Sequence, residues 1–88
     1  MSTRRMIPLP TLTLLGLERP IPVRDAVLVE YGRNGLTEWV IRTGQELPPE
    51  LIRRTLTFRA GGYEGACYYA DRHELRGSGP VRGLHEGC

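Results

Sequence analysis

An 88-residue chain is long enough for one small domain and no more. Because 40% of its residues are hydrophobic, the chain is not disordered by composition, and a formal net charge of +2 does not suit a strong polyanion binder. No stretch approaches the roughly 20 apolar residues of a membrane span. Prolines at positions 8 and 10 interrupt the apolar N-terminal region, which is not typical of a signal peptide. Two cysteines without a CxxC spacing suit a reducing compartment, so we expect a cytoplasmic protein.

The first half of the chain predicts three strands. Leu12 and Leu14 alternate with threonines within residues 10–17, which favours a short strand, and the proline-containing stretch ERPIP ends it. Two further strands, over residues 23–31 and 36–43, flank the turn sequence GRNG.

The register of this first hairpin stays open between two turn lengths. A four-residue loop places Leu28 opposite Trp39, whereas a two-residue Asn-Gly turn shifts the pairing. In either register both faces carry large apolar side chains, which is not typical of a hairpin with one face in water. The two apolar sets are Val27, Val29 and Val40 on one face and Leu28, Trp39 and Ile41 on the other. We expect the rest of the chain to cover one face, and closure of the sheet or a second copy of the protein to cover the other.

The segment QELPPELIRRTL predicts a helix of about two turns after the first hairpin. Pro48 or Pro49 suits the first helical position, where a missing N–H costs nothing. Glu50 in the first turn and Arg53 and Arg54 in the last turn suit the helix dipole.

A second hairpin is predicted over residues 56–60 and 65–71, with GGYE as its loop and Phe58 opposite Cys67. Glycines from residue 77 onward predict a flexible tail over 77–88, which leaves one domain over 1–76. The fold class expected is α+β: a mostly antiparallel sheet of about five strands, closed into a small barrel or open, with one short helix between strands 3 and 4.

A cysteine, an aspartate and a histidine lie close together in EGACYYADRHE, residues 64–74. If this segment is a strand, Cys67 and His73 are about 20 Å apart, whereas a nucleophile and its base need to lie roughly 3 Å apart. Cys67 is therefore interpreted as a core residue, and Asp71 with His73 as a surface pair. We predict no catalytic residues and no enzyme activity.

Three residues of the types that bind metals, His73, His85 and Cys88, do not have the spacing of a zinc module. The glycines near residues 61–65 lack the Lys-Ser/Thr pair and the following helix of a phosphate loop. We expect no metal and no cofactor.

The function predicted is a small non-catalytic binding or assembly module, forming a homodimer or binding another protein or a small ligand. The alternative is an OB-like protein that binds single-stranded nucleic acid, because the predicted element order is shared by OB barrels. Nucleic acid is the less favoured partner, since acidic residues are almost as numerous as basic ones. The candidate binding residues are of the types that anchor interfaces, aromatic residues and arginine: Tyr31, Trp39, Arg53, Arg54, Arg59, Tyr63 and Tyr68. Trp39 has a competing interpretation as a core residue.

Overall fold

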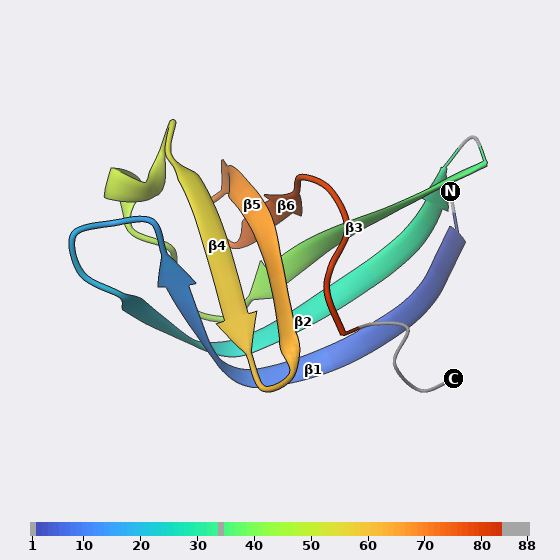
Figure 1. Ribbon diagram of the computed structural model, residues 1–88, viewed down its shortest axis with the longest axis horizontal. Coiled ribbons are helices and arrows are strands. Elements are labelled where there is room, and N and C mark those ends of the chain that lie inside the picture. The colour runs from blue at the N-terminus through green and yellow to red at the C-terminus, as the bar shows by residue number, and fades with distance from the viewer. Residues whose placement is uncertain (1, 34, 84–88) are drawn as a thin grey trace.

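The computed structural model describes residues 2–33 and 35–83, which form a closed six-stranded antiparallel barrel (Figure 1). The strands follow one another around the barrel in the order β1-β2-β3-β6-β5-β4. Their bounds are β1 Ser2–Leu15, β2 Ile21–Arg33, β3 Leu36–Thr43, β4 Thr55–Ala60, β5 Tyr63–Asp71 and β6 Glu74–Gly77. The fold is therefore all-β, which corrects the expected α+β class, while the mostly antiparallel sheet and its closure into a small barrel are confirmed.

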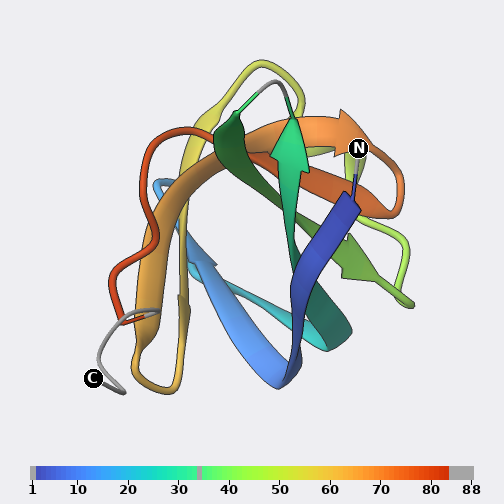
Figure 2. The same ribbon diagram turned by 90° about the vertical axis from the view of Figure 1, so that its right-hand side faces the viewer.

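Two three-stranded meanders, β1-β2-β3 and β4-β5-β6, build the barrel and meet at two short seams. At one seam Thr13–Leu15 of β1 pairs with residues 57–59 of β4. At the other seam Val40–Arg42 of β3 pairs with residues 74–76 of β6. Outside these seams β1, β2 and β3 run on together as a curved band beyond the barrel (Figures 1 and 2).

β1 and β2 share a corner that lies between the two seams. The pairing passes from Leu9 with Ala26 to Thr11 with Arg24, and Pro10 and Asp25 between them are not paired. Asp25 has a φ of 56°, in the left-handed region. On β2 the buried side chains change from Val23 before the corner to Ala26 and Leu28 after it, so the corner reverses which residues of the strand face inward.

The first hairpin adopts the two-residue register. Arg33 pairs with Leu36, and Leu28 pairs with Ile41, so the four-residue loop and the Leu28–Trp39 pair are wrong. A shift of two residues keeps every side chain on its own face. Leu28 and Ile41 are therefore fully buried inside the barrel, as either register requires.

The second hairpin shows the same kind of shift. Ala60 pairs with Tyr63, so the loop is Gly61–Gly62 and the predicted pair of Phe58 with Cys67 is wrong. Gly61 has a φ of 58°, which the first position of a tight II′ hairpin turn requires. Phe58 and Cys67 still share the inner face of the barrel.

The predicted helix is wrong. Among the described residues the helical segment is a 3-10 turn, Pro49–Leu51, followed by Ile52 in an extended conformation. Arg53 then takes a φ of 64°, and Thr55 already begins β4. A helix this short is marginal on its own, so pairing of β4 with β1 and β5 outweighs it.

The strand β6 is not among the predicted strands, and the segment after it falls within the predicted flexible tail. Beyond Gly77 the chain continues along β5: the Ser78 N–H donates to Ala66 O at 2.9 Å, and the Arg82 N–H donates to Glu64 O at 2.8 Å. Val81 is 4% exposed and belongs to the core. Residues 78–83 are thus packed, residues 84–88 lie outside the described residues, and the tail boundary at 77 stays a prediction.

Candidate interaction surface

The outward side chains of β1, β2, β3 and β6 near the seam between β3 and β6 form one surface, the outer face. Residues on it alternate with core residues, because successive side chains of a strand point to opposite sides. Its members are Met6, Val27, Val29, Tyr31, Glu38, Val40, Arg42, Glu74 and Arg76. Most of them line one shallow hollow that crosses the four strands.

An apolar row crosses this face. Met6 pairs with Val29, and Val29 pairs with Val40, so the three side chains are neighbours on adjacent strands. Met6 is 63% exposed. Val40 is buried but does not belong to the core cluster, which shows that outer-face side chains cover it. The barrel therefore carries a second, smaller apolar cluster on its outside.

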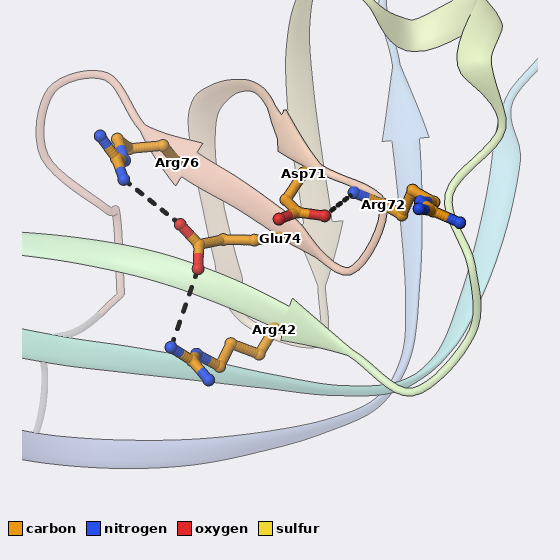
Figure 3. Close-up of polar contacts among 5 residues, drawn as sticks. All are labelled: Arg42, Asp71, Arg72, Glu74 and Arg76. Carbon is orange, nitrogen blue, oxygen red and sulfur yellow. Dashed lines mark hydrogen bonds and ion pairs between the residues drawn. The ribbon is translucent and has the colours of Figure 1, made fainter.

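Charged side chains border the apolar row on the β6 side. Glu74 lies between two arginines: its Oε1 is 3.9 Å from Nη2 of Arg42, and its Oε2 accepts a hydrogen bond from Nη2 of Arg76 at 3.4 Å (Figure 3). This hydrogen bond to Glu74, and then the proximity of Tyr68, raise the pKa of the Arg76 guanidinium. Tyr31 contributes in the same direction. The carboxylate thus offsets part of the positive charge of this region.

Only part of the predicted site is on this surface. Tyr31 lies on the outer face, and Tyr68 extends the same row on β5, where it pairs with Arg76 and is 43% exposed. Trp39 is 5% exposed inside the barrel, and its Nε1 donates to Gly79 O at 2.7 Å. The interpretation of Trp39 as a core residue therefore matches its position.

The other four candidates lie elsewhere. Arg53 and Arg54 are exposed on the connection into β4. Arg59 is outward on β4, where its Nη2 is 3.5 Å from Oε2 of Glu64. Tyr63 is half-buried next to the β4–β5 turn. The structure does not bring these residues together with Tyr31 and Tyr68.

Two features of the outer face are absent from the sequence-based site. Met6 precedes the first predicted strand, within residues 10–17, and the Glu74 cluster depends on β6, a strand of four residues. Alternation with Ile7 and Leu9 was the available signal for Met6. No local pattern signals the cluster, since it forms only when β3 and β6 pair.

The structure also separates the cysteine, aspartate and histidine of residues 64–74. Burial raises the pKa of the Cys67 thiol from 9.0 to about 12, so it is protonated at neutral pH. His73 is exposed in the β5–β6 turn, where its Nδ1 lies 3.1 Å from Thr43 O. Asp71 is exposed beside it and accepts a hydrogen bond from the Arg72 N–H. The segment forms most of β5 and the β5–β6 turn, with Cys67 in the core and Asp71 and His73 at the surface.

Within residues 2–33 and 35–83, no three His, Cys, Asp or Glu side chains are grouped closely enough to hold a metal ion. His85 and Cys88 lie outside the described residues. None of the helical structure described has the length and apolar character needed to cross a membrane. Comparison of the chain with protein-family models, with curated proteins and with solved structures finds no match.

Proposed function

We propose that this protein is a non-catalytic assembly module that forms a homodimer through its outer face. The observation that carries the proposal is the apolar row of Met6, Val29 and Val40 on the outside of a closed barrel. Clustered apolar side chains on a protein surface usually mark an interaction site. Self-association through one shared patch is the commonest way to cover such a site.

The barrel interior supports this proposal, because it is filled without the outer face. Phe58, Leu28 and Ile41 are fully buried within one continuous core cluster, and the outer row is not part of that cluster. The outward valines and Met6 are therefore not needed to complete the core. Their contribution is better explained by contact with another molecule.

The edge of the sheet supports association through a face and not through strand addition. β1 pairs with β4 only at Thr13–Leu15, so among the described residues its N-terminal half has one partner strand, β2. Pro8 pairs with Val27 within that ladder. Since proline has no N–H, Pro8 fits there only with its backbone nitrogen toward the open edge. The edge therefore lacks a donor where an incoming strand needs one.

Replacement of Met6 by glutamate tests the proposal. Met6 is 63% exposed, so the charge will leave the fold intact and disfavour the apolar contact. We expect the wild-type protein to sediment as a dimer at micromolar concentration and Met6→Glu to weaken dimerisation at least about tenfold, which corresponds to about 1.4 kcal/mol.

Ile52→Glu is the matched control, because Ile52 is 48% exposed on the connection between β3 and β4, outside the outer face. This variant should dimerise like the wild type. A wild-type protein that stays monomeric at high micromolar concentration would contradict the proposal, as would equal effects of the two substitutions.

The alternative function, binding of single-stranded nucleic acid, has one observation in its favour. Arg76 lies close to both Tyr31 and Tyr68, and bases stack on tyrosines beside an arginine in many single-strand binders. Glu74 counts against it, since a carboxylate between Arg42 and Arg76 repels phosphate. Titration with single-stranded oligonucleotides over a range of salt concentrations separates the two functions. Tight, steeply salt-dependent binding by a monomer would favour the alternative.

A further inference from the structure

Along β3 the outward side chains are an acid, an apolar residue and a base, in that order. Glu38, Val40 and Arg42 alternate with the inward residues Trp39 and Ile41, so the three share the outer face. Glu38 and Arg42 are each two residues from Val40, about 6.6 Å along the strand in opposite directions. This order is self-complementary, because rotation by 180° about an axis that crosses β3 at Val40 exchanges the positions of the acid and the base.

We propose that two copies pack outer face to outer face about a two-fold axis through Val40, with Glu38 of each copy opposite Arg42 of the other. The inference rests on the proposed homodimer and specifies its geometry. The axis lies in the plane of the interface and crosses β3, so that the two β3 strands run antiparallel, one above the other. The apolar row lies along the axis, so Met6 and Val29 face their counterparts in the second copy, and the buried Val40 lies beneath the centre of the contact.

Both charges are available for this contact. Among the described residues Glu38 forms no ion pair. The Arg42 side chain is 71% exposed, and its contact with Glu74 is long, 3.9 Å. Exposed ion pairs of this kind contribute little to stability, so Arg42 is free to pair with a second copy at small cost.

Sheet packing geometry allows the contact. Packed sheets lie about 10 Å apart with strands inclined by about 30°. At about 6.6 Å from the axis this inclination displaces Glu38 sideways from Arg42 by only about 3 Å, which two long side chains can span. Arg76 pairs with Val40 on β6, so it lies beside Val40 on the axis and faces Arg76 of the second copy. Glu74 of the same copy, 3.4 Å away, offsets the charge of each Arg76. The arrangement therefore creates two new ion pairs, and each arginine near the axis keeps an acidic partner.

A charge-exchange experiment tests this geometry. Glu38→Arg and Arg42→Glu each convert two attractive contacts into two repulsive ones, so each variant alone should dimerise at least about tenfold more weakly than the wild type. An equimolar mixture should form a heterodimer with wild-type affinity within about threefold, because each variant supplies the charge that the other lacks. The double variant Glu38→Arg/Arg42→Glu should likewise recover the homodimer.

Sedimentation velocity measures the affinities, and native mass spectrometry of one ¹⁵N-labelled variant mixed with its unlabelled counterpart counts heterodimers. Circular dichroism confirms that each variant is folded, and Arg82→Glu, a reversal on an exposed residue outside the outer face, is the control. Failure of the mixture and of the double variant to recover dimerisation would overturn the two-fold axis at Val40. If Met6→Glu still weakens the dimer in that case, the outer face remains the interface with a different axis. A monomeric wild type would instead remove both proposals.

Discussion

Trp39 occupies a slot that glycine residues leave open. Its ring packs edge-on against Phe58, with the ring centres 5.4 Å apart, and its Nε1 donates to Gly79 O. A Cβ atom on Gly77 would lie 2.2 Å from Cε2 of the indole, and one on Gly65 would lie 3.2 Å from Cζ2. These glycines are required for space, since neither has a positive φ.

Gly77→Ala should therefore lower the free energy of unfolding by about 1–3 kcal/mol, the usual cost of overpacking a core. The added methyl overlaps a rigid, buried ring, so the backbone of β6 has to move. Gly62→Ala is the control, because no atom lies within 4 Å of a Cβ there and its φ is not positive. Urea denaturation followed by Trp39 fluorescence measures both variants. Equal stability of the two would show that the indole is not held in this slot.

At this scale the sequence assigns residues to faces better than it assigns roles. Alternation groups Leu28 with Trp39 and Ile41 on one face and Phe58 with Cys67 on another, and both groups lie inside the barrel, because the period of a strand is local. The roles of Trp39 and Met6 depend on what lies opposite them, and that is decided by strands far away in the chain. For this reason the candidate site contains Trp39 and omits Met6.

The corner of β2 shows how a single strand changes which of its side chains face the core. Asp25 has a φ of 56°, a conformation in which short polar residues are favoured over β-branched ones. The neighbouring Arg24 is exposed as well, but it pairs regularly with Thr11 and has no positive φ. The strain of the corner is thus concentrated at one residue.

Asp25→Val should lower the free energy of unfolding by about 1–2 kcal/mol, while Arg24→Val should change it by less than about 0.5 kcal/mol. Asp25→Gly should be clearly more stable than Asp25→Val, because glycine tolerates the left-handed conformation. Thermal denaturation of the three variants gives the comparison. Equal destabilisation by both valine substitutions would mean that the corner is not strained.

The elements differ in how far the sequence predicts them. Both hairpins are predictable, because glycine turns and alternating residues act within about ten positions. Their exact registers are not, since loops of two and four residues keep the same faces. The helix over QELPPELIRRTL is the failure: its caps and charges favour a helix, yet Leu51 and Leu56 are buried as parts of a turn and a strand. In this segment the pairing of β4 with other strands determines the secondary structure, and the local helix preference does not.

For the whole molecule, the segment after β6 packs against the barrel. Val81 is buried in the core, and the backbone of Arg82 pairs with Glu64. Together with the hydrogen bond from Trp39 to Gly79, these contacts fix residues 78–83 beside β5. A glycine-rich composition did not indicate this, because one buried valine among flexible residues leaves no periodic pattern.

Val81→Ala should lower the free energy of unfolding by about 1–3 kcal/mol, because the removed methyl groups leave a cavity in the core. It should also speed subtilisin cleavage between residues 77 and 83. Arg82→Ala is the control: the bonds to Glu64 are made by the backbone, so stability should change by less than about 0.5 kcal/mol. A Val81→Ala protein as stable and as resistant as the wild type would support the flexible tail over 77–88 that the glycines predict.

The two short seams are the non-local pairings of this barrel. Each meander forms from neighbouring strands, but the seams join Leu14 to Phe58 and Ile41 to Leu75, residues far apart in the chain. Such non-local pairing makes β-barrels fold slowly, on the order of milliseconds to seconds. In a chain that has formed only the first meander, the inner face of β1, β2 and β3 is uncovered. The second meander has to close over it at both seams before the core is shielded from water.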